Sequence, residues 1–214
     1  MPDSLMERYA REPDSIERRS LDMVEAAIPA CSGWTSAARE VVKRMIYSVG
    51  DLALAGLTRV HLDAIEAGLE AVRAGAPIVC DVRMVAAGLR PCDNTVHVAV
   101  DRIERSTRRY TRAAAGMREL HEELDGALAV IGNAPTALLA LLDMIDANRC
   151  RPALIIGTPV GFVAAAESKQ ELIQRDVPYI TVEGSRGGSP IAAAAMNALL
   201  ILGAPSQASS PLTP

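Results

Sequence analysis

Hydrophobic and polar residues repeat along this chain with two different periods, and the first of them is helical. Apolar residues recur three and four positions apart in three early segments, 13–28, 35–49 and 61–75. Asp14 or Ser15 is expected to cap the first of these helices, and Thr35 or Ser36 the second. Gly75 is expected to end the third, because glycine readily adopts the left-handed conformation that follows a helix. The first part of the chain is therefore predicted to be helical.

The period changes after residue 75. Five short runs rich in β-branched and other apolar residues follow, at 77–81, 95–100, 127–132, 152–157 and 178–184. Segments with helical spacing lie between and after them, at 111–124, 134–145, 160–173 and 188–202. Short strands that are apolar on both faces and separated by helices are typical of a parallel sheet covered on both sides. The pattern predicts an α/β fold with a mostly parallel five-stranded sheet and helices on both faces.

Length and composition refine this picture. The chain has 214 residues, which favours one domain over two, and we expect that domain to span 1–203. Residues 204–214 are rich in Pro and Ser and are expected to be disordered. Half of the residues are apolar but only 3% are aromatic, so the core must depend on close packing of small and aliphatic side chains.

Charge, hydropathy and cysteine spacing exclude several classes of function. The net charge of −4 gives no general attraction for nucleic acid or for an anionic membrane. The N-terminal residues are too charged for a signal peptide, and no apolar run reaches membrane-spanning length. The four cysteines lack metal-ligand spacing, so we expect reduced thiols in a cytoplasmic protein without a metal site; they are Cys31, Cys80, Cys92 and Cys150.

Three of the predicted strands end in turns that contain glycine and lead into a helix. Their sequences are "IGNAP" at 131–135, "GTPVG" at 157–161 and "GSRGGSP" at 184–190. Glycine lets the backbone approach a ligand, and the free N–H groups at a helix start attract anions. None of these turns is a nucleotide-binding fingerprint. They predict a wide anion-binding crevice at the carboxyl edge of the sheet, although such turns also simply begin helices.

Arginines are the second indication of an anionic ligand. They lie on predicted helix faces or beside strand ends, at Arg18, Arg19, Arg44, Arg83, Arg112 and Arg186. Arginine forms paired hydrogen bonds with carboxylates, so a polycarboxylate ligand is one explanation for them in an acidic protein. The other explanation is that they are surface charges or partners of the many glutamates.

Side chains for nucleophilic catalysis are not evident in the sequence. His61, His97 and His121 each fit a structural role better than a catalytic one, and no Ser-His-Asp or Cys-His set can be assembled from them. Glu167 and Lys169 either contribute to a site or form an ordinary exposed pair.

Seven motifs, in this order, are similar to those of the precorrin-8X methylmutase family. They are "RRS" at 18–20, "RMIYSVGD" at 44–51, "AGAPIVCDVRMVAAG" at 74–88, "TRAAA" at 111–115, "AVIGNAPTALLALL" at 129–142, "PALIIGTPVGFVAAAESK" at 152–169 and "GSRGGSPIAAAAMNAL" at 184–199. The similarity covers roughly residues 7–201. It implies a flavodoxin-like three-layer fold, a homodimer with the active site near the subunit interface, and no cofactor.

The resemblance also implies the reaction, which moves a methyl group from carbon 11 to carbon 12 of a corrin precursor. Precorrin-8X becomes hydrogenobyrinate, or cobalt-precorrin-8 becomes cobyrinate, in cobalamin biosynthesis. The sequence leaves open whether the ring contains cobalt. The substrate is a macrocycle fringed with carboxylates, which agrees with the arginines and the anion-ready turns. The substrate-binding residues that the resemblance implies are Arg18, Arg19, Ser20, Asp81, Arg83, Thr111, Arg112, Asn133, Pro135, Thr158, Arg186, Gly187 and Gly188.

Tyr47 is where this sequence departs from its apparent relatives. The family has a histidine two positions after the "RM" pair, and that histidine is taken to be the acid group. An imidazolium loses its proton near neutral pH, whereas an ordinary phenol has a pKa of about 10 and is a weaker acid. Arg44 lies one helical turn away, and we expect it to make the hydroxyl more acidic. Tyr47 and Arg44 are therefore the predicted catalytic residues.

Two alternatives to the enzyme remain at this point. The chain could be a tetrapyrrole-binding homologue that kept the pocket and lost the acid group. It could also be an anion-binding sensor with a flavodoxin-like fold.

Overall fold

The computed structural model of the chain describes residues 4–6, 13–28, 33–105 and 108–204. Its helices are α2 (Pro13–Ala27), α3 (Ser36–Val49), α4 (Leu54–Leu57), α5 (Ala64–Arg73), α6 (Arg83–Ala87), the 3₁₀ helix η1 (Ala99–Asp101), α7 (Arg112–Glu119), α8 (Pro135–Asp146), α9 (Ala165–Ile173) and α10 (Ser189–Gly203). Its strands are β1 (Thr58–Val60), β2 (Ile78–Cys80), β3 (Val96–Val98), β4 (Leu128–Ile131), β5 (Leu154–Gly157) and β6 (Tyr179–Val182). Cys31 and residues 205–214 of the tail predicted to be disordered lie outside the described residues.

The six strands form one sheet in the order β1-β6-β5-β4-β2-β3. The five strands predicted from the sequence are all present and pair in parallel. Their order is the flavodoxin-like one, in which the chain direction across the sheet reverses between the first and third parallel strands, here β2 and β4. The predicted strand count of five is wrong, because β1 adds an antiparallel edge strand beside β6.

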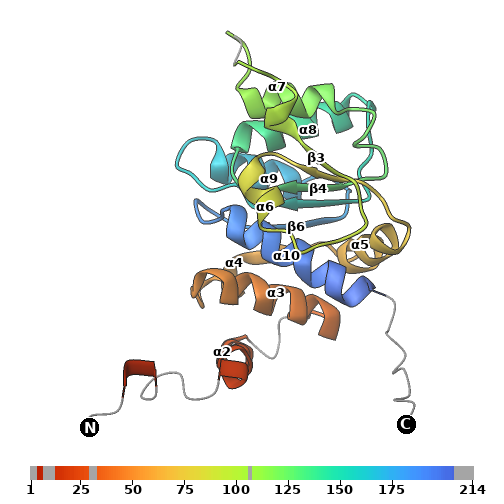
Figure 1. Cartoon of the computed structure of the whole chain (residues 1–214). Helices are drawn as coiled ribbons and strands as arrows, with labels where there is room; N and C mark the ends of the chain where they lie inside the picture. Colours follow the sequence, from red (N-terminus) through yellow and green to blue (C-terminus); the bar gives the residue numbers. More distant parts are fainter. Residues whose placement is uncertain (1–3, 7–12, 29–32, 106–107, 205–214) are drawn as a thin grey trace.

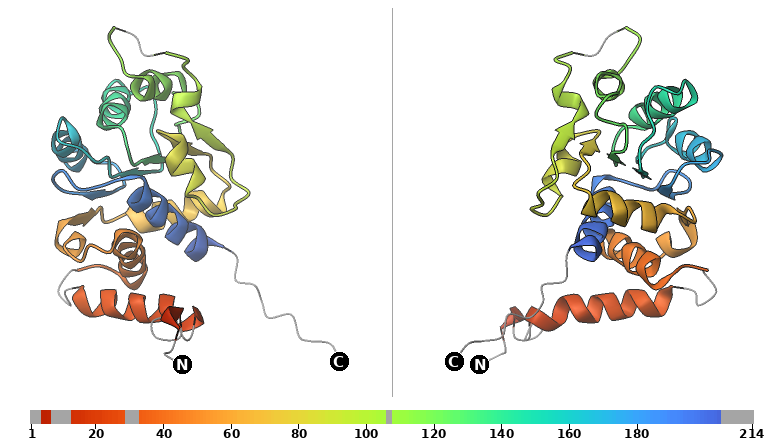
Figure 2. Two further views of the ribbon diagram at one scale, coloured as in Figure 1. Left: turned by 60° about the vertical axis from the view of Figure 1, so that its left-hand side comes forward. Right: turned by 90° about the vertical axis from the view of Figure 1, so that its right-hand side faces the viewer.

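Helices cover both faces of the sheet and give each face its own hydrophobic core. Side chains from α3, α5 and α10 pack on the face that includes Ile78, Val130 and Ile156. Side chains from α7 and α8, with Leu172 of α9, pack on the face that includes Ala129. Figure 1 shows α7 and α8 above the sheet and α10 below it, with α3 beyond α10. In both views of Figure 2, α2 lies on the outer side of α3.

Helix boundaries follow the expected capping residues in part. The Thr35 side chain accepts a hydrogen bond from the Ala38 amide at the start of α3, and Gly75 (φ 70°) follows the end of α5, as predicted. The capping prediction for α2 is wrong, because that helix already begins at Pro13. The segment predicted as a helix from residue 160 becomes helical only at Ala165, after the positive φ of Ala164.

The described cysteines agree with the predicted reduced state. Cys80, Cys92 and Cys150 are free thiols, and burial raises the pKa of Cys80 to about 12, which makes it unreactive. Within the described ranges no group of histidine, cysteine and acidic side chains is arranged to hold a metal ion. No helix in those ranges has the length and apolarity to cross a membrane.

Candidate active site at the carboxyl edge of the sheet

The carboxyl ends of the parallel strands lie at one edge of the sheet, where their loops meet the end of α3. The β2, β4, β5 and β6 strands run side by side in register, so the turns that follow them lie next to one another. Arg186, in the loop after β6, donates from Nε to Oδ2 of Asp51 at 2.9 Å. Asp51 follows α3 directly, so this ion pair ties the helix that carries Tyr47 to the strand-end loops.

Asp81, which follows β2, organises the turn between β4 and α8. Its buried carboxylate accepts hydrogen bonds from the amides of Gly132 (3.2 Å), Asn133 (2.8 Å) and Ala134 (2.6 Å). Burial raises the pKa of Asp81, and these backbone hydrogen bonds oppose that rise. The amides of this turn therefore already hold a carboxylate of the protein itself. The Asn133 amide is therefore engaged within the protein, and a role of Asn133 in substrate binding stays a prediction.

Gly132 must be glycine for a packing reason. A Cβ at this position would lie 2.8 Å from the Cα of Ser189 and 2.9 Å from the Cβ of Ala192, both at the start of α10. The turn after β4 and the start of α10 are thus in direct contact, and Pro135 begins α8 immediately beyond it. This close approach places the first turn of α10 beside Asp81.

The loops after β5 and β6 lie against each other through their backbones. The Gly188 amide donates to the Thr158 carbonyl at 2.8 Å, and the Gly161 amide donates to the Ser185 carbonyl at 3.2 Å. A Cβ on Gly187 would lie 2.3 Å from the Thr158 carbonyl oxygen, so only glycine fits there. The two loops move as one unit if either is displaced.

Lys169 supports these loops from α9. Its side chain is fully buried, and its Nζ donates to the carbonyl oxygen of Arg186 at 2.5 Å. Burial lowers the pKa of Lys169 to about 8. The interpretation of Glu167 and Lys169 as an exposed pair is therefore wrong, since only Glu167 is exposed.

Two buried hydroxyl groups near these loops have no hydrogen-bond partner within the described part of the chain. They are Oγ1 of Thr158 and Oγ of Ser189, the first residue of α10. Buried hydroxyls are normally hydrogen-bonded, so unpartnered ones beside a row of strand ends indicate a place that a polar ligand can complete. Thr158 is one of the predicted substrate-binding residues, and Ser189 belongs to the glycine-bearing turn at 184–190 that the sequence predicts to attract anions.

Tyr47 lies near the end of α3 with 41% of its surface exposed. The next residue, Ser48, lines a pocket of about 340 Å³ together with Met84 of α6 and Ser189 and Asn197 of α10. The phenol is therefore accessible from solvent, and its neighbour in sequence, Ser48, lines a hollow beside the strand ends.

Arg44 has two carboxylate partners in place of the phenol. Its Nη1 donates to Glu17 of α2 at 2.6 Å and its Nε donates to Glu40 at 3.1 Å. These carboxylates pair with the guanidinium, and a catalytic role of Arg44 beside Tyr47 stays a prediction. Arg44 joins α2 to α3.

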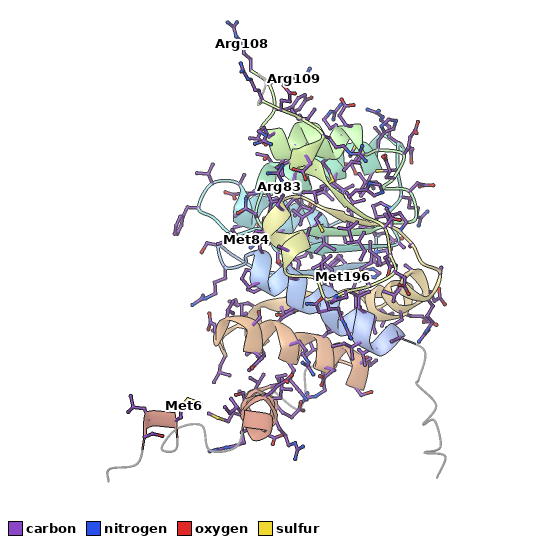
Figure 3. All side chains as sticks on the ribbon, in the orientation of Figure 1. Met6, Arg83, Met84, Arg108, Arg109 and Met196 are labelled. Carbon is purple, nitrogen blue, oxygen red and sulfur yellow. The ribbon has the colours of Figure 1, made fainter. Side chains whose placement is uncertain are left out.

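The other arginines predicted to bind substrate are separated from one another. Arg83 starts α6 and pairs with Asp101 at 2.7 Å, yet remains largely exposed. Arg112 donates to the Val100 and Ile103 carbonyls and so supports the segment after β3. Figure 3 shows Arg83 and Met84 together on α6, whereas Arg108 and Arg109 lie far beyond them.

The remaining predicted residues lie on α2 and at the start of α7. Arg18, Arg19 and Ser20 are on α2, on the far side of α3 from the sheet, and the Ser20 hydroxyl donates to the Ile16 carbonyl of its own helix. Thr111 caps α7 through the Ala114 amide, and its hydroxyl lies 2.7 Å from that of Thr136.

The three histidines have no place at this edge. The His61 amide donates to Tyr179 at the beginning of β6, which is the opposite edge of the sheet. This position agrees with the structural role predicted for His61. His97 lies in β3 within 3.0 Å of Arg102, and His121 follows α7.

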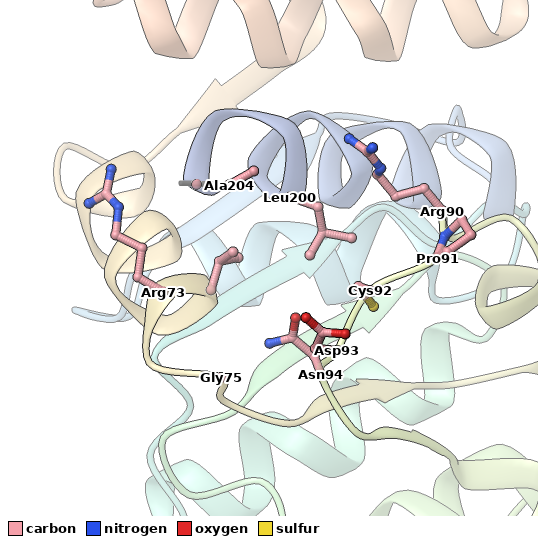
Figure 4. Close-up of a pocket in the computed structure, with 11 residues that line it drawn as sticks. Arg73, Gly75, Arg90, Pro91, Cys92, Asp93, Asn94, Leu200 and Ala204 are labelled. Carbon is pink, nitrogen blue, oxygen red and sulfur yellow. The ribbon is translucent and has the colours of Figure 1, made fainter. Parts of the chain in front are cut away.

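A larger cavity, of about 660 Å³, lies at the opposite, amino edge of the sheet. Arg73, Arg90 and Cys92 line it together with Leu200 near the end of α10 (Figure 4). This cavity is remote from the strand-end loops, and α10 runs the length of the sheet between the two places. In open α/β sheets the ligand lies at the carboxyl ends of the strands, which favours the smaller hollow near Tyr47.

A comparison with known protein families shows the family to which this chain belongs. The sequence profile of the precorrin-8X methylmutase family matches residues 15–202. The chain belongs to that family. The resemblance read from the sequence motifs is thereby confirmed, and with it the prediction of a methylmutase, an isomerase of cobalamin biosynthesis.

Individual members of the family are similar over most of the chain. Precorrin-8X methylmutase of Pseudomonas aeruginosa is 41% identical over 201 residues, which cover 89% of this chain and 96% of that protein. Cobalt-precorrin-8 methylmutase of Priestia megaterium is 38% identical over 200 residues, covering 89% and 88%. The precorrin-8X methylmutase crystal structure from Thermus thermophilus matches with a TM-score of 0.79 and 41% identity, covering 89% of this chain and 98% of that one.

Proposed function

We propose that this chain moves a methyl group from carbon 11 to carbon 12 of a corrin precursor, either precorrin-8X or its cobalt-containing counterpart. Family membership over residues 15–202 carries the proposal. The carboxyl edge of the sheet supports it, because Arg186 and the glycine-bearing loops suit a ring fringed with carboxylates. The product is hydrogenobyrinate for the metal-free substrate and cobyrinate for the cobalt complex.

The macrocycle lies between the end of α3 and the loops that follow β2, β5 and β6. Arg186, Gly187, Gly188 and Thr158 contact one side of the carboxylate fringe. Asp81 shapes the turn after β4 by holding three amides there, and Pro135 begins α8 beyond that turn; both border the substrate. Arg83 and the α2 residues serve carboxylates further out, where their side chains are exposed.

Tyr47 provides the hydroxyl that acts on the ring. The methyl group leaves carbon 11 and joins carbon 12 of the same molecule, so no atom is gained or lost and no oxidant is needed. A hydrogen bond from a phenol to the conjugated ring changes its electron distribution and facilitates this shift. The exposure of Tyr47, whose neighbour Ser48 lines the hollow, supports this role.

A spectroscopic assay tests the reaction and the phenol together. Purified protein is mixed with precorrin-8X, and the absorbance change to hydrogenobyrinate is followed over time. We expect conversion by the natural chain, and a rate lowered about 10²-fold or more in Tyr47→Phe, which removes only the hydroxyl. Tyr179→Phe is the matched control, because Tyr179 lies against His61 at the start of β6, at the opposite edge of the sheet.

Each result has a separate meaning. Tight binding of the substrate without any spectral conversion would mean a tetrapyrrole-binding protein and would end the enzyme proposal. Conversion at an unchanged rate in Tyr47→Phe would remove the phenol from the mechanism but leave the activity. Tyr47→His places the residue of the family at this position, and a faster rate in that variant would support the location of the acid group.

We also propose that the active form is a homodimer with the site near the interface. The loop after β5 exposes the one phenylalanine of the chain, Phe162, which is 97% exposed, with Val160 and Val163 beside it. Large apolar side chains that project in this way are typically covered by a partner, and a second copy of this chain is the partner we propose. This loop adjoins the loop that carries Arg186, so the second copy lies near the site.

Light scattering after gel filtration measures the mass of the assembly. We expect the mass of a dimer for the natural chain and a shift toward the monomer in Phe162→Ser. Leu62→Ser is a matched control, because Leu62 is 94% exposed at the opposite edge of the sheet. A natural chain with the mass of a monomer, or equal masses for both variants, would contradict this interface.

Two coarser proposals complete the picture. Residues 1–203 form one domain, in support of which β1 and β6, from distant parts of the chain, pair in a single sheet. The protein works in the cytoplasm, in keeping with the free thiols of the described cysteines.

A further inference from the structure

Lys169 is unusual for its residue type and for its surroundings. The chain has two lysines, Lys43 and Lys169, among its 22 basic residues, and arginine fills the other basic positions. Lys43 lies in the ordinary position, partly exposed and within 3.4 Å of Glu25 and 3.0 Å of Glu40. Lys169 is fully buried, and its one hydrogen bond within the described part of the chain goes to the Arg186 carbonyl. A fully buried lysine without a carboxylate partner is rare in proteins.

No acidic side chain described near α9 is available to neutralise Lys169. The carboxylates on α9 itself and on the elements around it are bound elsewhere or exposed: Glu171 and Asp146 bind Arg175, Glu183 binds Arg59, Asp51 binds Arg186, and Glu167 and Asp143 are exposed. Arg186, whose carbonyl oxygen accepts from Lys169, carries a positive charge as well. Burial without a counter-charge lowers the pKa of Lys169 to about 8.

The atoms above Lys169 are arranged to accept an anion. Arg186 is followed by the two glycines and by the start of α10, a helix of 15 residues whose amino end carries partial positive charge. In the described structure the amides of Ser189 and Ile191 have no acceptor. The Ser189 and Thr158 hydroxyls, both buried and without a partner, lie at the same loops.

These observations have one common explanation. We propose that Lys169 is a positioning residue for one carboxylate of the substrate: its ammonium group fixes the Arg186 carbonyl, so that the Arg186 side chain and the first amides of α10 face that carboxylate. The positive charge of Lys169 is then balanced by the bound carboxylate and by no group of the protein. This inference rests on the proposed function, because it takes the ligand to be a corrinoid polycarboxylate.

The proposal has a consequence that a purely structural lysine would not have. Substrate binding brings a negative charge near Lys169 and favours its protonated form, so binding near pH 8 takes up protons. Removal of the lysine abolishes this uptake and weakens binding. It does not weaken the fold, because it also removes the cost of burying an uncompensated charge.

The experiment titrates hydrogenobyrinate, the stable product, into the natural chain, Lys169→Met, Lys169→Gln and the control Lys43→Met. Calorimetry at pH 8 in two buffers of different ionisation enthalpy gives affinity and proton uptake together. We expect the dissociation constant to rise at least tenfold in Lys169→Met and to stay within twofold in Lys43→Met. The natural chain takes up a fraction of a proton, and Lys169→Met takes up correspondingly less.

Lys169→Gln separates the hydrogen bond from the charge, and it also covers the case in which Lys169→Met does not fold. Its amide can still donate to the Arg186 carbonyl, so we expect an affinity between those of the natural chain and Lys169→Met, without the proton uptake. Urea unfolding at pH 7 completes the set, and we expect neither variant to be less stable than the natural chain.

Three results would overturn the proposal. They are unchanged affinity in both Lys169 variants, unchanged proton uptake in them, and a loss of affinity that only follows a loss of stability. Failure of the natural chain to bind hydrogenobyrinate is a different result, because it counts against the proposed function itself.

Discussion

The turn between β4 and α8 and the turn between β6 and α10 look alike in sequence but differ in what lies beneath them. Each follows a buried parallel strand, contains glycine and leads into a helix with a proline in its first turn. A buried charged side chain supports each turn. Asp81 accepts three amides of the first turn, whereas Lys169 donates to a carbonyl of the second.

The sign of that buried charge decides what each turn can bind. The amides after β4 are occupied by the Asp81 carboxylate, so this turn is closed to an external anion. Lys169 engages a carbonyl and leaves the Ser189 and Ile191 amides without an acceptor, so the turn before α10 is open to one. Loops that are similar in sequence can thus have different roles at one edge of the sheet. The turn between β4 and α8 stabilises the fold, and the turn between β6 and α10 is open to a ligand.

The largest expected effect on stability comes from the turn between β4 and α8. Asp81→Ala leaves three amides without their acceptor, and we expect the free energy of unfolding to fall by about 3–5 kcal/mol. Asp81→Asn keeps one acceptor oxygen and should lose about 1–2 kcal/mol. Urea denaturation measures both. A loss below about 1 kcal/mol in Asp81→Ala would show that these amides find other acceptors and would undermine the contrast.

Lys169 supports the turn between β6 and α10, and its contribution to the free energy of unfolding should change with pH in the opposite sense to that of an ordinary lysine ion pair. The pKa of Lys169 is about 8 in the folded protein, against 10.5 as its ordinary value, so between these pH values the unfolded chain binds more protons. Its contribution to stability therefore rises with pH from about 8 to about 10.5, by roughly 3 kcal/mol in full. Denaturation curves of the natural chain and Lys169→Met, taken from pH 7 to 10.5, give the free energies of unfolding of both, and the difference between them should become smaller as the pH rises. A difference in stability between the two proteins that stays the same at every pH would contradict the lowered pKa of Lys169.

Substitutions of two glycines test whether the close contact between the loops after β5 and β6 is needed for binding. Gly187→Ala places a Cβ 2.3 Å from the Thr158 carbonyl oxygen, and we expect it to cost about 1–3 kcal/mol of stability and to weaken hydrogenobyrinate binding. Gly184→Ala meets no atom within 4 Å and has only the strain of a positive φ, about 1 kcal/mol, with little effect on binding. Equal binding by both variants would mean that the contact between the loops after β5 and β6 is not needed.

The smallest effect is expected at the ion pair that joins Arg186 to α3. Both side chains of the Arg186–Asp51 pair are substantially exposed, so Asp51→Asn should lower stability by less than about 1 kcal/mol. The same variant leaves Arg186 free for substrate, and hydrogenobyrinate should bind equally or more tightly at low salt. Weaker binding would indicate that Asp51 orients Arg186 and does not compete with the substrate.

Most of the fold could be predicted from the sequence, because buried parallel strands and the helices between them have different periods. The five parallel strands lie where the apolar runs predicted them. The edge strand β1 was missed because its three residues are joined to the sheet only through β6, which is distant in sequence. The late start of α9 was missed because the loop before it, including Phe162, is apolar although it is exposed.

The site could be predicted only in outline. The glycine-bearing turns and Arg186 indicated the right edge of the sheet, and the family motifs indicated the reaction. Pairing between distant residues decides the rest, and a single sequence contains no record of it. Asp81 with three amides, Arg44 with Glu17 and Lys169 with the Arg186 carbonyl are all contacts of this kind.

The packing of α3 against α10 bears on how the protein is made. The apolar face of α3, with Val41, Val42 and Met45, is buried largely by the last helix of the described chain. On the ribosome α3 emerges long before α10, and β1 likewise waits for β6. The helix that carries Tyr47 therefore lacks its main packing partner until α10 has been synthesised. A nascent chain stalled before Ser189 would lack both α10 and the site. It would expose the apolar face of α3 to the quality-control machinery of the cell.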